Sequence, residues 1–326
     1  MRELKIEKND SGQRLDKFIT KALDLPLSLL YKSIRLKKIK VNRKRAEIST
    51  MLREGDTVQC FLAEEFFAKL DRGEGEVKLS LAKITPRLDI IYEDENVMLL
   101  NKRPGVSVHE DESSNVNTLI NHVRAYLYQK GEYDPEDEMS FSPALCNRID
   151  RNTGGIVIAA KNAEALRTMN LMIKERRIQK YYLAAIHGIP KEKSAILKAY
   201  LIKDEKSNQV RVYDKNAPKG AKEIVTGYRV IATAGQNALL EVELFTGRTH
   251  QIRAHMAHIG HPLIGDGKYG VNKTDRTKGY KYQALYSYKL RFSFGDEGGA
   301  LAYLSGKEFS IPKSDIYFTS DFFGKQ

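Results

Sequence analysis

The amino-acid sequence predicts an α+β protein in which a small unit of two helices and a strand precedes a larger domain of strands and helices. The chain has 326 residues, enough for about two domains at ~150 residues each. Apolar residues recur at helical spacing near the N-terminus, whereas later segments show the period-two alternation or the short apolar runs of strands. Residues 66–86 have no sustained apolar period. We therefore expect a first domain over 1–65, a linker over 66–86 and a second domain over 87–326.

Two short helices and then a strand are predicted in the first domain. Apolar residues that share one face predict the first helix: Leu15, Phe18, Ile19 and Leu23. Pro26 starts a second helix. Polar and apolar residues alternate over 38–42, and a turn over 53–56 leads into a further strand over 57–61.

The second domain opens with two short strands around an acidic turn, over residues 89–102. The most apolar strand, 156–160, follows a loop that contains Asp150. An isolated carboxylate in a loop is usually a turn former or a helix cap. A chemical role would require a nearby cation that keeps its pKa low. Arg148 and Arg151 are the local candidates.

Asn162 is the predicted N-cap of a helix that runs to about Lys174. The strand that follows, 179–187, alternates with period two. This alternation sends Lys180 and Tyr182 to the same side.

A last helix is predicted from a cap at Thr249 to Gly260, with Arg253 one turn from its start. Four of the seven histidines lie in or beside it: His250, His255, His258 and His261. Zinc-binding helices pair histidines four residues apart and place an acid nearby, which His250 and His255 do not match. We expect no metal, and assign these histidines to packing or to contacts with a partner.

The formal net charge of +12 is unevenly distributed. Residues 1–60 hold 15 Lys and Arg against 8 Asp and Glu, residues 61–150 hold 10 against 18, and residues 151–326 hold 29 against 16. Eight of the fourteen residues from Lys32 to Arg45 are basic. Two basic blocks around an acidic one favour a polyanionic partner such as RNA. We expect the acidic loops of the middle block to face away from it, leaving Asp150 as the one acid of that block in a cleft.

The composition also excludes several classes of protein. No apolar run approaches the ~18 residues of a membrane span, and the first twelve residues lack the apolar segment of a signal peptide. Cys60 and Cys146 lie far apart and form no CxxC motif. This cysteine usage favours a reducing cytoplasm over a disulfide scaffold. A monomer is the default expectation.

Taken in order, the motifs of the chain resemble those of the RluA family of pseudouridine synthases. They are Asn101-Lys102-Arg103-Pro104-Gly105, Arg148-Ile149-Asp150 with Thr153-Gly154-Gly155, Lys180-Tyr181-Tyr182-Leu183-Ala184, and Gly247 to His255 with Gly260-His261-Pro262 and Gly265-Asp266. Residues 12–62 are in turn similar to the S4 RNA-binding module, through Arg14-Leu15-Asp16, Val41-Asn42 and Gly55-Asp56. The resemblance is closest to members of the family that carry such a module and act on large-subunit ribosomal RNA.

This resemblance implies a mixed, mostly antiparallel central sheet with flanking helices, preceded by an S4-like domain. It implies an enzyme that converts specific uridines in RNA to pseudouridine. Asp150 would be its catalytic aspartate, Tyr182 its active-site tyrosine, Arg253 the arginine that pairs with the aspartate, and Arg148 the residue that fills the space of a flipped nucleotide. Further RNA contacts are expected at Lys102, Lys180, Arg248, His250, Arg14, Lys32, Arg35, Lys37, Lys38, Asn42, Arg43, Lys44 and Arg45. Because the product is an isomer of the substrate, no cofactor is needed.

The chain departs from the family pattern at several positions. Asn147 stands where histidine is common, Ile149 where leucine is common, Gly154 where serine is common, and Arg103 separates Lys102 from its proline. The glycines usual on either side of the Val41-Asn42 pair are absent. None of these positions is the catalytic aspartate, so we expect activity to be retained.

Two other functions compete with this interpretation. An RNA-binding protein without activity would have no need of Asp150, Tyr182 and Arg253 together. A methyltransferase attached to an RNA-binding module would need a glycine-rich loop between a strand and a helix, which the sequence lacks. A hydrolase has no support either, because neither GxSxG nor HExxH occurs.

Overall fold

The structure, a computed structural model, describes the chain except residues 24, 72–73, 111–116, 205–208 and 325–326. The N-terminal segment forms its own antiparallel sheet in the order β1 (Arg2–Lys5), β4 (Thr57–Cys60), β2 (Ile39–Val41) and β3 (Lys44–Arg45). The helices α1 (Leu15–Ala22) and α2 (Leu27–Arg35) bury their apolar faces with this sheet in a separate core. The predicted helices and the strands near 38–42 and 57–61 are confirmed, whereas β1 and β3 were not predicted.

The segment expected to be a linker, residues 66–86, is largely helical. It forms η2 (Glu64–Phe67), α3 (Ala68–Asp71) and α4 (Glu74–Lys83). Phe67 is buried in the N-terminal core and Leu81 in a core of the large sheet. The side chain of Gln129 also donates to the Leu81 and Ile84 carbonyls, which ties the end of α4 to α5 (Leu119–Gln129). Burial against distant elements, rather than local periodicity, therefore accounts for these helices.

The rest of the chain builds one large sheet, with strands in the order β11-β10-β12-β13-β9-β14-β8-β6-β5. Among the described strand pairs of this sheet, β14 with β8 is the one parallel pair, so the expected mostly antiparallel sheet is confirmed. Two short strands, β7 and β15, pair with β8 and β14. The bounds are β5 (Ile90–Glu93), β6 (Val97–Lys102), β7 (Ala144–Leu145), β8 (Gly154–Ala160), β9 (Ile178–His187), β10 (Ser194–Asp204), β11 (Gln209–Tyr213), β12 (Lys222–Ala234), β13 (Asn237–Leu244), β14 (Leu285–Phe292) and β15 (Glu308–Ser310).

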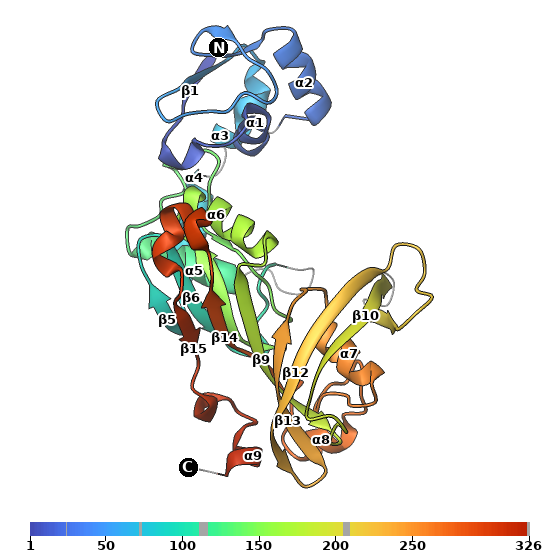
Figure 1. Cartoon of the computed structure of the whole chain (residues 1–326). Helices are drawn as coiled ribbons and strands as arrows, with labels where there is room; N and C mark the ends of the chain where they lie inside the picture. The colour runs from blue at the N-terminus through green and yellow to red at the C-terminus, as the bar shows by residue number, and fades with distance from the viewer. Residues whose placement is uncertain (24, 72–73, 111–116, 205–208, 325–326) are drawn as a thin grey trace.

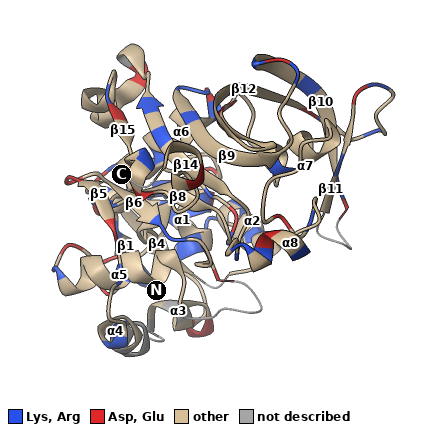
Figure 2. Ribbon diagram, turned by 90° about the horizontal axis from the view of Figure 1, so that it is seen from below, with Lys and Arg blue, Asp and Glu red and all other residues tan. Residues whose placement is uncertain are grey.

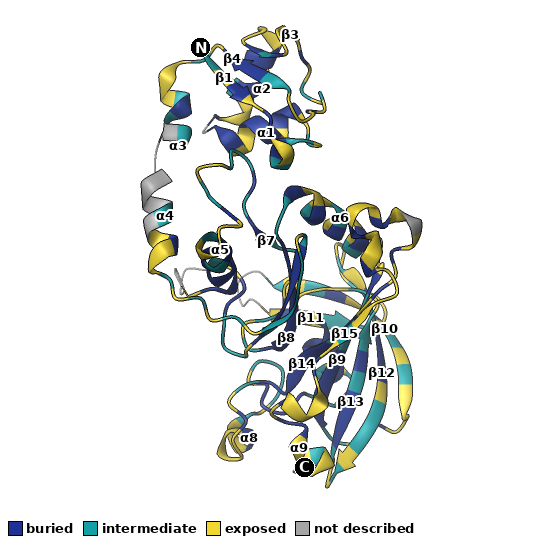
Figure 3. Cartoon of the chain, turned by 90° about the vertical axis from the view of Figure 1, so that its left-hand side faces the viewer, coloured by how far each residue is buried: buried dark blue, intermediate teal, exposed yellow. Residues whose placement is uncertain are grey.

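Helices cover both faces of the sheet, and alternate residues of its strands enter two different cores. In β8, Ile156 and Ile158 pack with α6 (Ala163–Lys174) and the 3₁₀ segment η3 (Gly295–Leu304). Val157 and Ala159 pack on the other face with α5 and α7 (Gln251–His258). Figure 3 shows the central strands as buried, whereas β10 and β12 carry many exposed positions. The remaining short elements are η1 (Lys8–Asp10), α8 (Lys273–Thr277), η4 (Lys313–Asp315) and α9 (Ser320–Phe323).

Two glycines let β8 approach β14 closely, next to the loop that carries Asp150. Gly155 has φ +115°, and a Cβ atom there would lie 2.2 Å from the Ser287 carbonyl oxygen. A Cβ atom at Gly154 would lie 2.3 Å from the ring of Tyr286. The absence of side chains at this pair therefore sets where β8 begins.

The caps of the two helices near the site differ from each other. Asn162 caps α6 as predicted, its side chain accepting a hydrogen bond from the Ala165 N–H at 2.8 Å. Thr249 does not cap α7, which corrects the prediction, because His250 occupies the N-cap with φ +53°. The turn before α7 is instead held by Gln251, whose Oε1 accepts from the Arg248 N–H and the Thr246 hydroxyl.

The N-terminal unit lies at one end of the molecule and contacts the large domain beside α6 (Figure 1). Asn9 Oδ1 accepts from the Ala163 N–H at 3.1 Å. The Ser140 hydroxyl donates to Asp10 Oδ1 at 2.5 Å and accepts from Gln13. Among the described residues, no helix is long and apolar enough to cross a membrane. Both cysteines are free thiols.

Candidate active site

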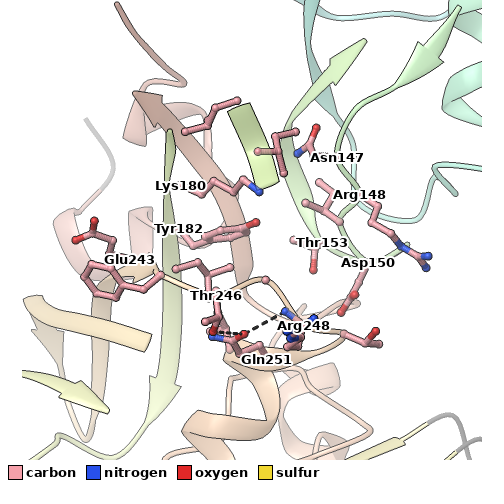
Figure 4. Close-up of a pocket in the computed structure, with 18 of the residues that line it drawn as sticks. Asn147, Arg148, Asp150, Thr153, Lys180, Tyr182, Glu243, Thr246, Arg248 and Gln251 are labelled. Carbon is pink, nitrogen blue, oxygen red and sulfur yellow. Dashed lines mark hydrogen bonds between the residues drawn. The ribbon is translucent and has the colours of Figure 1, made fainter. Parts of the chain in front are cut away.

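A cavity of about 770 Å³ opens on the face of the sheet that carries α7. Its walls come from the loop before β8, the start of β9, the end of β13 and the turn into α7. Figure 4 shows Lys180 and Tyr182 on one side of it and Arg148 and Asp150 on the other. The structure thus brings together residues that the sequence predicted in three separate motifs.

Asp150 is paired with Arg253, as expected. Arg253 Nη1 donates to Asp150 Oδ2 at 2.8 Å, although the two residues are 103 positions apart in the chain. The other donors of the same guanidinium bind Asp266 in a bidentate pair, Nε to Oδ2 at 2.7 Å and Nη2 to Oδ1 at 2.9 Å. The Asp266 side chain is fully buried, whereas that of Asp150 is one-quarter exposed. Arg253 is therefore fixed from behind and presents one donor to the carboxylate in the cavity.

Asp266 is a residue of the site that the sequence prediction did not select, although the Gly265-Asp266 motif was noted. Burial raises its pKa, but the hydrogen bonds and charge of Arg253 outweigh burial and hold the pKa below its usual range. The N–H groups of Lys268 and Tyr269 also donate to Oδ1. The carboxylate is thus ionised and fully paired. The sequence signal that could have identified Asp266 is its position directly after Gly265, a glycine that forms a tight turn.

His250 lies beside the same pair. Its Nε2 is 3.8 Å from Asp150 Oδ2, and its Nδ1 shares a hydrogen bond of 2.8 Å with the Tyr269 hydroxyl. Burial lowers the pKa of His250 to about 4, even though the charge of Asp150 acts in the opposite direction. The imidazole is therefore neutral at neutral pH, and Arg253 supplies the ion pair of Asp150.

Tyr182 and Lys180 point from β9 into the cavity, as the period-two alternation predicted (Figure 4). Tyr182 is 6% exposed. Burial raises the pKa of its phenol to about 12, and the charge of Asp150 acts in the same direction. The ring is therefore a protonated phenol at neutral pH, and its carbon face forms part of the cavity wall.

Lys102 does not reach the cavity, and this corrects the expectation that it contacts RNA. It is 1% exposed, and its ammonium donates to the carbonyls of Arg103, Val106 and Arg151 at 2.9 to 3.1 Å. Burial lowers its pKa to about 7, and the charge of Asp150 opposes this shift. Lys102 instead joins the loop after β6 to the turn directly after Asp150.

Gln251 is a second residue that the sequence prediction did not select. It is 2% exposed, and its Nε2 donates to the Val225 carbonyl and the Thr226 hydroxyl on β12. Since its Oε1 accepts from Arg248 and Thr246, this one side chain connects the turn before α7 to the sheet. Nothing in the local sequence identifies this role, because the partners lie about twenty-five positions away.

Two departures from the family pattern have structural explanations. Asn147 Oδ1 accepts from the Ile158 N–H at 2.8 Å and so continues the pairing of β7 along β8. Gly154 leaves room for the ring of Tyr286, whose hydroxyl donates to Asn101 at 2.7 Å. A serine side chain at 154 would project into that ring.

The cations expected to contact RNA are mostly exposed. Arg148 and Arg248 line the cavity and are exposed. On the N-terminal unit the exposed residues are Lys32, Arg35, Lys37, Lys38, Asn42, Arg43, Lys44 and Arg45. Arg14 differs, because it forms an ion pair of 2.9 Å with Asp16. Asn42 and Arg43 adopt φ +50° and +64°, so this turn forms without the usual glycine.

The acids of the middle block lie away from the cavity where the structure describes them. Glu93 pairs with Lys130 and Lys161, and Glu138 with Asn9. Of the described residues 61–150, Asp150 is the one acid that lines the cavity. Asp111 and Glu112 lie outside the described residues. Cations, by contrast, lie on elements outside the middle block, such as α2 and β10 (Figure 2).

The four clustered histidines point to different partners. His250 binds Tyr269, His255 binds Thr226, His258 binds Asp214, and His261 binds the His187 carbonyl. Within the described part of the chain, no three His, Cys, Asp or Glu side chains converge to hold a metal ion.

Solved structures of other proteins share the fold. The structure of human RNA pseudouridylate synthase domain containing 1 aligns with a TM-score of 0.57 at 21% identity, covering 73% of this chain and 91% of the other. Human RNA pseudouridylate synthase domain containing 4 aligns with a TM-score of 0.53 at 18% identity, over the same shares. The fold is therefore that of pseudouridine synthases.

Sequence comparisons identify the family. A family model described as RNA pseudouridylate synthase matches residues 96–258. The ribosomal large subunit pseudouridine synthase C of Vibrio vulnificus is 33% identical over 293 residues, 88% of this chain and 87% of that protein. An uncharacterized RNA pseudouridine synthase of Mycoplasma genitalium is 31% identical over 291 residues, 88% of each chain. The chain belongs to the RNA pseudouridylate synthase family and is an isomerase of the RluA type, which confirms the resemblance found in the sequence.

Proposed function

We propose that this enzyme isomerises specific uridines of large-subunit ribosomal RNA, with Asp150 as the catalytic residue acting on a flipped uridine. The observation that carries the proposal is the Asp150 carboxylate at the cavity, held at 2.8 Å by Arg253. The relatives named ribosomal large subunit pseudouridine synthase C support the choice of RNA. Action on ribosomal RNA is consistent with a cytoplasmic location. We further propose that the enzyme acts as a monomer.

The reaction breaks the bond between uracil N1 and ribose C1′, rotates the base and joins C5 to C1′; one proton leaves C5 and one is taken up at N1. The product is therefore an isomer of the substrate, so no group donor or redox partner enters. Asp150 serves as the nucleophile or the base of this sequence, since a carboxylate can attack an electrophilic carbon or accept a proton and still leave. Arg253 keeps it ionised and aimed, because a charge-assisted hydrogen bond stabilises the anion and fixes its direction.

The target base must leave its helix to reach Asp150. Unstacking a nucleotide costs a few kcal/mol. Tyr182 offsets this cost by packing its ring on the extruded base, and Arg148, exposed at the rim, occupies the vacated space. Because the phenol is protonated at neutral pH, we assign Tyr182 to stacking rather than to proton removal.

We further propose that residues 1–65 form an S4-like domain that binds RNA. Its exposed cations on α2 and the following strands support this assignment. These are the residues expected from the sequence, and phosphate contacts are their general use in RNA recognition. Residues 66–86 would then connect this domain to the catalytic domain over 87–326.

The Asp150→Asn variant tests the catalytic assignment. We expect it to bind ribosomal RNA like the wild type and to form no pseudouridine, measured by mapping modified positions in RNA incubated with each protein. Asp137→Asn, which removes an exposed acid from the middle block, is the matched control and should retain activity. Full modification by Asp150→Asn would refute the role of Asp150. Identical pseudouridine maps of large-subunit RNA from cells with and without the protein would refute the proposed substrate.

A further inference from the structure

One end of the cavity is formed by the last residues of α6 and the turn into β9, which the proposed chemistry does not use. Ile173 and Lys174 of α6, Arg176 of the turn and Gln179 of β9 line the same cavity as Asp150. Three cations at this end, Lys174, Arg176 and Lys180, face a cavity whose described acids are Asp150 and Glu243. The charge at this end therefore favours an anionic occupant.

Arg176 is placed there by an unfavourable backbone conformation. It has φ +58° directly after the last residues of α6. The Arg176 N–H donates to the Ile173 carbonyl and the Arg177 N–H to the Met172 carbonyl, the hydrogen-bond pattern that ends helices with a left-handed residue. Glycine is favoured at this position because other residues strain there. The benefit of an arginine must therefore come from its side chain.

Two polar groups of residues that line the same cavity as Arg176 have no partner among the described residues. The buried Oε1 of Gln179 receives no hydrogen bond from any described residue. No described residue forms a hydrogen bond or an ion pair with the Lys180 ammonium, and burial lowers the pKa of this group. A phosphate in the cavity would supply the missing acceptor for Lys180.

The neighbouring residue provides a contrast. Arg177 does not line the cavity, and its guanidinium pairs with Glu297 at 3.3 Å. Two adjacent arginines thus have different surroundings, one at the cavity and one at a surface ion pair.

We propose that Arg176, with Lys174 and Lys180, binds the phosphate of a nucleotide that flanks the target uridine. This subsite positions the RNA strand without reading its sequence, because a phosphate contact carries register rather than base identity. The proposal rests on the function proposed above and adds the path of the strand beyond the flipped base, from Asp150 along β9 to the end of α6.

The Arg176→Gly variant of the full-length enzyme tests this subsite, with a fragment of large-subunit ribosomal RNA as substrate. We expect KM to rise about tenfold with kcat retained, the usual effect of losing one charge-assisted contact. The slope of log Kd against log salt concentration should fall by roughly 0.7 to 0.9, one phosphate contact. The variant should unfold at the same or a higher temperature, because glycine relieves the left-handed strain. Arg176→Lys should recover part of the lost affinity.

Arg177→Ala is the matched control, since it removes the same charge one residue away and should leave KM within twofold of the wild type. Equal KM values for Arg176→Gly and Arg177→Ala would overturn the subsite while leaving the proposed function intact. Loss of kcat in Arg176→Gly with KM unchanged would also overturn it. A wild-type enzyme that forms no pseudouridine in the fragment would instead count against the proposed substrate, and the subsite would then be judged by the difference in RNA affinity between the two variants.

Discussion

Arg253 divides its guanidinium between two carboxylates of unequal exposure. Two donors bind the buried Asp266, and one binds Asp150 at the cavity. Since the bidentate pair fixes the plane of the guanidinium, the position of the third donor follows from it. We infer that Asp266 positions Arg253 and thereby aims Asp150.

The Asp266→Asn variant should lose activity through misplacement of Arg253. We expect kcat to fall by about 10²-fold, because small misplacements in an active site have effects of this size. Removing one partner of a buried pair should also lower the free energy of unfolding by about 3–5 kcal/mol. Steady-state kinetics and urea unfolding measure the two effects.

Asp275→Asn is the control for this prediction. Asp275 is also buried, accepts a hydrogen bond from the Gly265 N–H and has its Oδ2 3.0 Å from His187 Nε2, whereas the described carboxylate partners of Arg253 are Asp150 and Asp266. The Asp275→Asn variant should have a lower free energy of unfolding than the wild type. At a temperature where the variant is folded, its kcat should stay within a few-fold of the wild-type value. Equal losses of kcat in both variants would mean that general loosening, rather than the orientation of Arg253, lowers activity.

Among the elements, the contact between β8 and β14 sets the start of the strand that follows the Asp150 loop. Gly154 makes room for Tyr286, and Gly155 for the backbone of Ser287. A clash caused by a side chain at position 154 would be relieved if the Tyr286 side chain moved. A clash at position 155 would not be relieved in this way, because the opposing atoms of Ser287 belong to the main chain.

Gly154→Ser, which restores the residue common in the family, should destabilise this protein by about 1–3 kcal/mol through overpacking. Combining it with Tyr286→Leu should recover part of that loss, which a double-mutant cycle of urea unfolding would show as a favourable coupling of about 1 kcal/mol. Strictly additive losses would contradict the steric explanation.

Within α7, His255 should make stability depend on pH. Burial lowers its pKa to about 4, and its Nδ1 lies 3.0 Å from the Thr226 hydroxyl. The charge of His258 lowers the pKa further, and that of Asp214 raises it. A folded pKa below the unfolded value of about 6.5 means that this contribution to stability is complete above about pH 6.5 and is lost as the pH falls toward 4.

The expected loss from His255 is up to about 3 kcal/mol between these pH values. The His255→Asn variant, which can keep the bond to Thr226, should show a smaller decline than the wild type over the same range. Free energies of unfolding measured from pH 7.5 to pH 4.5 test this difference. Parallel curves for the two proteins would show that another group causes the acid instability.

At the scale of the whole molecule, the N-terminal unit places a set of exposed cations at one end of the protein. They lie on α2, in the turns on either side of β2 and on β3, within the N-terminal unit at the top of Figure 1. The unit is joined to the large domain through Asn9, Asp10 and Gln13. An RNA that contacts these cations and the cavity would therefore be held at two places along its length.

Replacing Lys32, Arg35 and Arg43 together by glutamine should weaken RNA binding and its dependence on salt. Each lost phosphate contact lowers the slope of log affinity against log salt by about 0.7 to 0.9, so we expect a decrease of about 2. The triple replacement of Lys191, Lys193 and Lys278 by glutamine changes the net charge equally and is the control. Equal slopes for the two triple variants would show that net charge alone, and not the N-terminal unit, determines binding.

Much of the site could be predicted because its signals are local. The order of the motifs indicated Asp150, Tyr182 and Arg253, and the alternation of β9 placed Lys180 with Tyr182. The resemblance to the family also places Lys102 among the RNA contacts. Three carbonyls from two loops hold it inside instead, and a sequence pattern does not show such a cage.

The sequence by itself determined the helices and strands with clear periodicity and the cap of α6 at Asn162, because these depend on residue types at short spacing, where local propensity and pattern decide. Its resemblance to a known family also indicated the class of enzyme and the three residues that the structure brings to one cavity, Asp150, Tyr182 and Arg253. The tertiary structure alone decided the pairing of Arg253 with Asp266, the burial of Lys102, the helix α4 and the place of Arg176 in the cavity. These depend on contacts between segments far apart in the chain, whose geometry is fixed when the sheet and its two cores assemble.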